Sequence, residues 1–145
     1  MKIINASPKH LEVVYRLICE LEDAKIDRED FAQVYLDNIN NHDVYYLLAV
    51  KEDDVVGFAS LHVQKLLHHC AKIGEIQEII IDRKQQGLGI GSMLFNKIVE
   101  IAESNECLQL EVCCSIAREL SHKFYLNHGM EKSHYKFTRA INTEG

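Results

Sequence analysis

The chain has 145 residues, 47% of them apolar, and a formal net charge of −6 at pH 7. This length suits one folded domain with its own core over residues 1–145, and the apolar content excludes a disordered chain. The negative charge argues against a nucleic-acid partner, which would require a basic face, and no apolar run approaches the roughly 20 residues that span a membrane.

The N-terminus and the cysteines indicate the compartment. Residues 1–5 have the pattern of a short strand and lack the layout of a secretory signal. The five cysteines are odd in number and have no framework spacing, which favours reduced thiols. We therefore expect a cytoplasmic protein that makes no membrane contact.

The first part of the chain predicts a strand followed by two helices. Residues 2–5 form the strand, and Ser7 and Pro8 then supply an N-cap and a proline at the first helical position. A second helix is expected at residues 28–40, capped by Asp27. Apolar residues spaced three and four apart give the first helix an amphipathic face: Leu11, Val14, Ile18 and Leu21.

The remainder of the chain alternates strands with two further helices. One helix follows a glycine-rich turn and has Ile90 and Leu94 on one face, and the last is expected at residues 117–128, with Gly129 as a left-handed cap. Gly57 interrupts a strand pattern and predicts a bulge or a close backbone approach. The strands are expected at residues 45–50, 55–66, 71–81, 107–112 and 130–141.

The segment Gln86–Gly91 is the strongest functional signal in the sequence. It follows the strand expected at residues 71–81, is rich in glycine and opens an amphipathic helix. Glycines let the backbone turn tightly and leave its N–H groups uncovered, and the helix start adds a partial positive charge. The order of strand, glycine turn and helix therefore predicts a site for a pyrophosphate.

Two other phosphate-binding motifs fit this segment poorly. A P-loop requires a lysine before its serine or threonine, but Gly91 precedes Ser92 here. The dinucleotide-binding fingerprint G-x-G-x-x-G follows the first strand of its unit, whereas the spacing here is G-x-G-x-G past the middle of the chain. A glycine-rich helix start that binds no ligand is the alternative.

Residues 86–91 fit the pattern [Arg/Gln]-x-x-Gly-x-[Gly/Ala], which resembles the acetyl-CoA pyrophosphate loop of the GNAT family of N-acetyltransferases. The resemblance runs over nearly the whole chain. It is closest to one branch of the family, the aminoalkylphosphonate N-acetyltransferases, in the segments at residues 17–21, 67–69, 73–79, 124–126 and 133–138.

The resemblance implies the acyl-CoA N-acyltransferase fold of the α/β class, which is a mixed, mostly antiparallel sheet with helices on both faces. It also implies acetyl-CoA as co-substrate, lying in a splay between the fourth and fifth strands. Main-chain groups of the strand expected at residues 71–81 would face the pantetheine arm, and backbone N–H groups of the Gln86–Gly91 segment would hold the pyrophosphate. The implied cofactor-binding residues are Ile79, Ile81, Gln86, Gly87, Leu88, Gly89, Ile90, Gly91 and Ser92.

The acceptor ammonium must lose a proton, so a carboxylate near the centre of the strand before the loop is the candidate base. Glu75 and Glu78 both lie there. Residues three apart in a regular strand point to opposite faces, so both can face the acetyl group only if a bulge intervenes. The resemblance favours Glu75, which falls where many relatives carry a glutamate that draws off the proton through water. Glu78 is the second candidate, and a solvated carboxylate is the alternative for either.

Tyr125 is the candidate acid for the departing thiolate. The pattern Phe124-Tyr125-x-x-x-Gly129 resembles the tyrosine helix of the family, in which the phenol lies near the CoA sulfur. An ordinary phenol can donate a proton to a thiolate. The alternative is a tyrosine that packs between helix and sheet with its hydroxyl merely hydrogen-bonded.

His68, His69 and Lys136 are the candidate substrate-binding residues. A protonated imidazole, together with Lys136 or Arg139, could neutralise a phosphonate. The alternative for the histidines is a turn at the surface between two strands. The family branch allows a divalent metal to assist, but adjacent strand histidines are poor joint ligands and no ligand-spaced motif is present, so no metal site is predicted.

Cys113 and Cys114 suggest a second kind of chemistry, a covalent acetyl-cysteine route. His122 and His128 follow them, but in no recognisable catalytic arrangement. Buried free thiols are the preferred interpretation.

The sequence therefore predicts an acetyl-CoA-dependent N-acetyltransferase that transfers the acetyl group directly to a small primary amine in a ternary complex. An aminoalkylphosphonate is the first expectation for this amine. The alternatives are another amine (a polyamine, an amino acid, an aminoglycoside or a protein N-terminus) or a non-catalytic CoA-binding module. The intact glycine loop together with Glu75 and Tyr125 argues against the module. A homodimer is common in the family, although the sequence identifies no interface.

Overall fold

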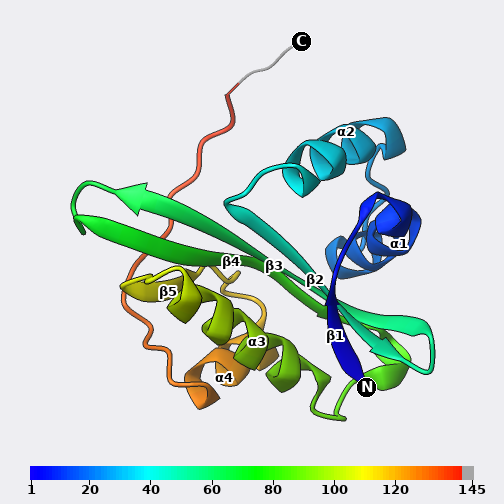
Figure 1. Cartoon of the computed structure of the whole chain (residues 1–145). Coiled ribbons are helices and arrows are strands. Elements are labelled where there is room, and N and C mark those ends of the chain that lie inside the picture. Colours follow the sequence, from blue (N-terminus) through cyan, green and yellow to red (C-terminus); the bar gives the residue numbers. More distant parts are fainter. Residues whose placement is uncertain (142–145) are drawn as a thin grey trace. The chain divides into compact units, whose positions relative to one another are not determined.

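The structure is a computed structural model that describes residues 1–141, which fall into two compact units (Figure 1). The first unit, Met1–Val112, contains a five-stranded sheet and the helices α1, α2 and α3. The second unit begins at Cys113 and contains the helix α4 (Glu119–Asn127). The expectation of one domain over residues 1–145 stays a prediction.

The elements of the first unit begin and end within a few residues of the predicted positions. The strands are β1 (Lys2–Asn5), β2 (Val44–Lys51), β3 (Asp54–Leu66), β4 (Ala71–Ile81) and β5 (Gln109–Val112). The helices are α1 (Leu11–Glu22), α2 (Arg28–Ile39) and α3 (Ile90–Ser104), with short 3-10 turns at Pro8–His10 and Arg83–Gln85.

The strands lie in the order β1-β2-β3-β4-β5, and all neighbours are antiparallel except β4 and β5, which are parallel. The parallel pair follows from the connection, because a helical crossover, α3, joins β4 to β5. Helices α1 and α2 cover one face of the sheet and α3 crosses the other (Figure 1). The predicted mixed, mostly antiparallel sheet with helices on both faces is confirmed.

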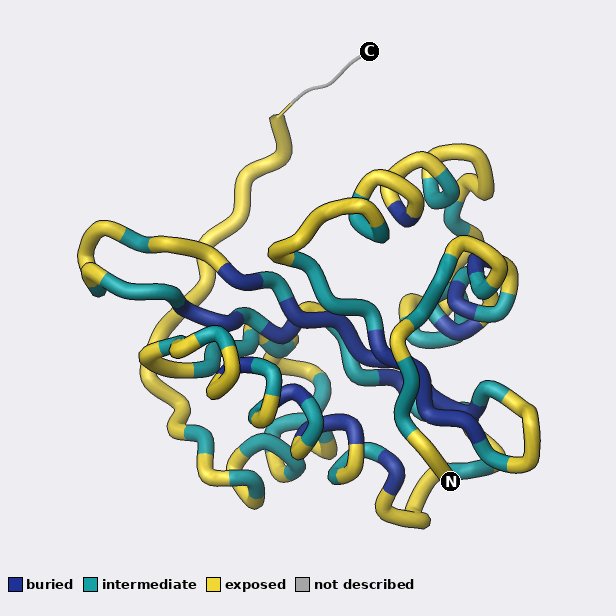
Figure 2. The backbone as a smooth tube through the Cα atoms, in the orientation of Figure 1, coloured by how far each residue is buried: buried dark blue, intermediate teal, exposed yellow. Residues whose placement is uncertain are grey.

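Both faces of the sheet are buried at its centre. Leu47 and Leu48 are neighbours on β2, so their side chains point to opposite faces, yet each is 0% exposed. Leu48 packs with Val14 and Leu17 of α1, and Leu94 of α3 is buried on the opposite face. Figure 2 shows the buried residues running along the central strands. This double burial fixes the register of the sheet.

β4 carries a bulge. Ser60 of β3 pairs with Glu78, but the next residue, Leu61, pairs with Ile76. Gln77 is therefore an extra residue on β4, with two residues opposing one across the pair. The bulge reverses the alternation of faces for the part of β4 that precedes it.

The reversal places both candidate bases on one face. Ser60 and His62 lie two apart on β3 and share the face of Phe58, which packs under α1 and α2. The partner of Ser60 is Glu78. The partner of His62 is Glu75. Directly opposed residues share a face, so Glu75 and Glu78 both lie on the α1/α2 face.

Gly57 marks a close approach, as its place inside β3 predicts. A Cβ at this position would lie 3.2 Å from Ile81 Cδ1 and 3.3 Å from Leu94 Cδ1. The pairing of β2 with β3 also shifts register nearby, between Ala49 and Val50. A side chain at residue 57 would therefore separate α3 from the sheet.

The second unit differs from the prediction at its C-terminal end. The helix predicted at residues 117–128 is confirmed as α4. The strand predicted at residues 130–141 is wrong, because no regular secondary structure is assigned there. Tyr135 and Phe137 in this segment are 87% and 92% exposed. Alternating apolar residues give a local preference, but a strand also needs a backbone partner for its hydrogen bonds.

All five cysteines are free thiols, as predicted. The expected burial of Cys113 and Cys114 is wrong, since the first is exposed and the second half-buried. They lie where β5 has ended and α4 has not begun, so neither sits on a packed element. Within residues 1–141, no helix is both long enough and apolar enough to cross a membrane.

Candidate active site

The glycine-rich turn joins β4 to α3 in the conformation that its sequence predicts. Gly87 and Gly89 have φ angles of 82° and 84°, a left-handed region that favours glycine. Gly89 is the N-cap of α3, whose first hydrogen bond runs from the Met93 N–H to the Gly89 carbonyl at 3.2 Å. The amides of the first helical turn are therefore directed out of the N-terminus, where they can meet an anion.

The space around this turn is open. A Cβ at Gly87 or Gly89 would have no other atom within 4 Å, and Leu88 between them is 61% exposed. Arg83 and Lys84 are also exposed and add positive charge just before the turn. A diphosphate could therefore reach bare backbone with cationic side chains nearby.

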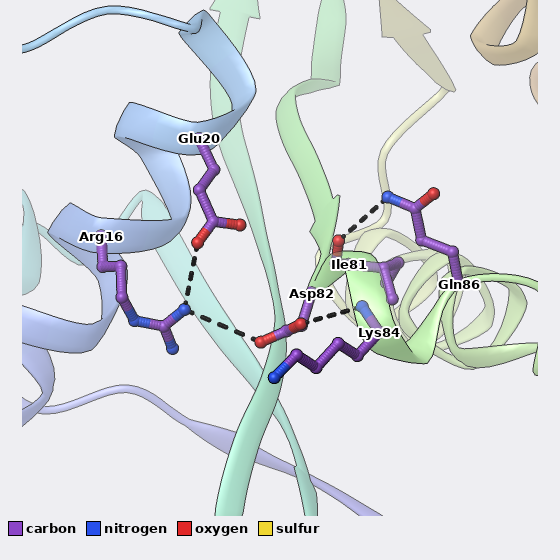
Figure 3. Close-up of polar contacts among 6 residues, drawn as sticks. All are labelled: Arg16, Glu20, Ile81, Asp82, Lys84 and Gln86. Atoms are coloured by element: carbon purple, nitrogen blue, oxygen red, sulfur yellow. Dashed lines mark hydrogen bonds and ion pairs between the residues drawn. The ribbon is translucent and has the colours of Figure 1, made fainter.

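Side-chain contacts hold the segment between β4 and the turn. The Asp82 carboxylate accepts a hydrogen bond from the Lys84 N–H at 3.0 Å and caps the 3-10 turn. Arg16 of α1 lies 3.7 Å from the same carboxylate (Figure 3). Gln86 donates from Nε2 to the Ile81 carbonyl at 3.3 Å. These contacts connect the turn to α1 and to the end of β4.

β4 extends beyond its parallel partner. The pairing of β5 with β4 covers residues 73–76 of β4 and ends at Val112. β4 continues to Ile81, and within the first unit residues 78–81 pair with β3 alone. Ile79 and Ile81 lie on this edge, where the family resemblance places the pantetheine arm. Their role through the main chain stays a prediction.

A cavity of about 330 Å³ lies on the α1/α2 face of the first unit. Helices α1 and α2 and strands β2, β3 and β4 all contribute to its lining. The lining side chains of α1 and most of those of α2 are apolar, whereas the strands and the end of α2 supply the polar ones. The polar lining residues are Asn38, Tyr46, His62, Gln77 and Glu78.

Aromatic rings form one wall of this cavity. Phe31 and Tyr35 of α2 are stacked, with 6.0 Å between their ring centroids. Tyr35 and Tyr46 are stacked at 5.4 Å, and Phe58 meets Tyr46 edge-on at 5.3 Å. Tyr35 stacks against both Phe31 and Tyr46 and is 2% exposed, so the rings support one another. The wall therefore gives an acceptor an ordered, largely apolar surface.

Glu78 is the carboxylate of the cavity, and Ser60 holds it in place. The Ser60 hydroxyl donates to Glu78 Oε1, and the Glu78 N–H donates to Ser60 Oγ at 3.1 Å. Ser60 is 0% exposed, so water does not compete for these bonds. Across the cavity, Asn38 Nδ2 donates to the Tyr46 hydroxyl at 2.7 Å. The result is an oriented carboxylate beside an oriented phenol.

The two tyrosines of the wall resist ionisation. Burial raises the pKa of Tyr35 to about 12, and the neighbouring Tyr46 adds to the rise. Burial also raises the pKa of Tyr46; the hydrogen bond from Asn38 opposes this rise, and the negative charge of Glu78 adds to it. Both phenols are therefore neutral near pH 7, and the carboxylate of Glu78 is the negative group of the wall.

The two candidate bases differ in their relation to the cavity. Glu78 lines it, whereas Glu75 is half-buried one step further along the same face and pairs with His62 of β3 and Glu111 of β5. The bulge satisfies the condition under which both carboxylates can face one site. Glu75 as the base stays a prediction, and the cavity favours Glu78.

The predicted substrate residues lie on other parts of the chain. His68 and His69 occupy the turn between β3 and β4, with 4.3 Å between their ring centroids, and His69 Nε2 lies 3.6 Å from Glu111 Oε2. Neither lines the cavity, and the turn agrees with the alternative considered for them. Lys136 belongs to the irregular segment of the second unit. Within residues 1–141, no three histidine, cysteine or acidic side chains are grouped as metal ligands.

Tyr125 lies on α4 of the second unit. Its ring meets that of Phe124 edge-on, with 5.3 Å between the centroids. Its carbonyl accepts hydrogen bonds from the N–H groups of His128 and Met130, each at 3.1 Å, which close the helix. The acid role of Tyr125 stays a prediction.

Comparison with known proteins identifies the class. The sequence model described as the acetyltransferase (GNAT) family matches residues 11–130. The chain belongs to this family, and it is an acetyl-CoA-dependent N-acetyltransferase, as its glycine turn and strand order predict.

Two relatives and one solved structure illustrate what this chain is similar to. An aminoalkylphosphonate N-acetyltransferase from Salmonella typhimurium is 37% identical over 137 residues, covering 94% of this chain and 89% of the relative. A glucosamine 6-phosphate N-acetyltransferase from Candida albicans is 30% identical over 94 residues, 63% of each protein. The crystal structure of an aminoglycoside 6′-N-acetyltransferase from Acinetobacter haemolyticus has a TM-score of 0.85 at 14% identity, covering 99% of this chain and 100% of that one. The fold is thereby confirmed.

The sequence did not point to five polar residues of the site: Asn38, Tyr46, Ser60, His62 and Gln77. Each lies inside a regular helix or strand, where a polar residue is usually taken for a solvated position. One signal was present, because Ser60 and His62 lie two apart in an otherwise apolar strand and so share a face. The pairing across β2, β3 and β4 was needed to show what that face meets.

We predict that Gly89→Val weakens acetyl-CoA binding at least tenfold, about 1.4 kcal/mol. Valine disfavours the φ of 84° and would cover the amides of the helix start. Isothermal titration calorimetry measures the change. Asp53→Val is the matched control for strain, because Asp53 is an exposed turn residue at a φ of 70° outside the loop. Full affinity in Gly89→Val would contradict the loop as the pyrophosphate site.

Proposed function

We propose that the acetyl acceptor is a short aminoalkylphosphonate that binds in the cavity beneath α1 and α2. The observation that carries this proposal is the cavity, in which the oriented carboxylate of Glu78, a suitable partner for an ammonium group, lies beside an ordered aromatic wall. The similarity to the Salmonella aminoalkylphosphonate N-acetyltransferase, which extends over 94% of the chain, supports the phosphonate.

Acetyl-CoA supplies the thioester, and the residues of the chain bind and orient it. We propose that the backbone from Gln86 to Ser92 holds the pyrophosphate at the start of α3. Main-chain groups of Ile79 and Ile81, on the edge that β5 leaves open, would hold the pantetheine arm and polarise the acetyl carbonyl. The aromatic wall of the cavity would hold the acceptor so that its nitrogen lies near this edge and attacks the thioester directly.

The acceptor must lose a proton before it can attack. We propose that Glu78 takes this proton, directly or through one water, because it lines the cavity and Ser60 keeps its carboxylate oriented. Glu75, which the sequence favoured, is the competing candidate on the same face. Tyr125 is proposed as the acid for the thiolate on the strength of its sequence pattern.

The substrate proposal predicts a narrow response in thiol release from acetyl-CoA. Aminomethylphosphonate and 2-aminoethylphosphonate should have kcat/KM values at least tenfold above those of spermidine, free amino acids, aminoglycosides and glucosamine 6-phosphate. Each amine is measured with a divalent cation and with a chelator. A preference for glucosamine 6-phosphate or for polyamines would overturn the proposed acceptor. A flat panel from a protein that binds acetyl-CoA would instead indicate a protein substrate or a non-catalytic CoA-binding module.

The base is assigned by matched isosteric variants. Glu78→Gln should lower kcat by roughly 10² to 10⁴, the usual contribution of a general base, and should flatten the acidic limb of the pH–rate profile. Acetyl-CoA affinity should stay the same, because the change lies outside the glycine loop. Glu75→Gln is the comparison on the same strand and face. If it removes the acidic limb while Glu78→Gln does not, Glu75 is the base.

Tyr125→Phe should lower kcat by about 10² or more, because the thiolate would leave without a proton donor. Calorimetry should show nearly unchanged affinity for acetyl-CoA. Tyr135→Phe, which removes the hydroxyl of an exposed tyrosine in the same unit, should keep the wild-type kcat. Wild-type turnover in Tyr125→Phe would remove the acid assignment.

A further inference from the structure

We propose that His62 determines specificity by binding the anionic end of the acceptor while the amine lies at Glu78. This inference rests on the proposed function and adds the residue that recognises the phosphonate. The sequence pointed instead to His68 and His69, which lie in the turn beyond the end of β3.

The chemistry of the cavity singles out His62. Of the described residues that line it, none is a lysine or an arginine, Glu78 is the carboxylate, and His62 is the one with a basic side chain. A phosphonate that enters this cavity loses part of its hydration shell and needs a cationic or hydrogen-bonding partner to compensate for that loss. A neutral imidazole supplies one N–H donor, and an imidazolium supplies two together with a positive charge. His62 is therefore the residue that suits this role.

The spacing along the sheet fits a short substrate. Ser60, which binds Glu78, lies two residues before His62 on the same face of β3. A strand rises about 3.4 Å per residue, so the two positions are roughly 7 Å apart. One or two carbon atoms between nitrogen and phosphorus would let an ammonium lie at Glu78 while a phosphonate oxygen approaches the imidazole. A longer diamine has no second anchor of suitable charge in this cavity.

The positions around His62 on the sheet are defined by strand pairing. Across β3 and β4, Glu75 is its direct pairing partner. On the other side, β2 places the apolar Val44 opposite His62. Asn38 of α2 and Tyr46 of β2 are the neutral polar groups of the same cavity.

The test compares two amines of similar length, 2-aminoethylphosphonate and propylamine. His62→Gln should lower the ratio of their kcat/KM values at least tenfold, chiefly through a higher KM for the phosphonate. His62→Lys, which keeps a positive charge, should recover part of the ratio. His42→Gln, which removes an exposed imidazole before β2, should keep the wild-type ratio. Acetyl-CoA affinity, measured by calorimetry, confirms that each variant is folded.

The possible failures are distinguishable. A wild-type protein that does not prefer the phosphonate overturns the proposed function and this inference with it. A wild-type protein that prefers the phosphonate, with the same preference in His62→Gln, overturns the inference alone. Loss of the preference in His68→Gln or His69→Gln in place of His62→Gln would assign recognition to the turn.

Discussion

The bulge at Gln77 is the constraint on which the rest of the site depends. With regular alternation, Ile76 would lie on the α1/α2 face and Glu75 on the other. The extra residue turns Ile76 towards the α3 side, where it is 1% exposed, and brings Glu75 onto the face of Glu78. One irregularity therefore completes the core and gathers two carboxylates beneath α1 and α2. The same strand continues past the end of its pairing with β5, so within the first unit the part of β4 nearest the glycine turn pairs with β3 alone.

Polar contacts, in addition to apolar packing, hold α1 and α2 over this face of the sheet. Arg28 at the start of α2 forms an ion pair with Glu12 of α1, and the Tyr15 hydroxyl donates to the Ile26 carbonyl between the helices. Tyr35 is 2% exposed and donates to the Ser7 carbonyl at 2.8 Å. These contacts hold the two helices together and fix Tyr35 within the aromatic wall, which gives the cavity a defined shape before any acceptor binds.

The sequence predicted the elements whose signals are local. Ser7 and Pro8, the apolar spacing of α1 and the glycines at residues 87 and 89 each depend on a few neighbouring residues. Features that depend on pairing were not accessible in this way. The bulge is a property of the pairing between β3 and β4. It determines which face of the sheet carries Glu75, and the alternation of residues along β4 alone does not reveal it. The strand predicted at residues 130–141 is wrong for a related reason. Apolar and polar residues alternate there, but within the described residues this segment pairs with no strand.

The most direct test of the proposed site is a crystal structure of the protein with CoA and the acetylated product that it forms. The amide nitrogen should lie on the α1/α2 face, within hydrogen-bond reach of Glu78 or one water away. CoA should follow the edge of β4 beyond Ile76 to the glycine turn. An amide nitrogen on the α3 face, or one separated from Glu78 by more than a water, would contradict the proposed site.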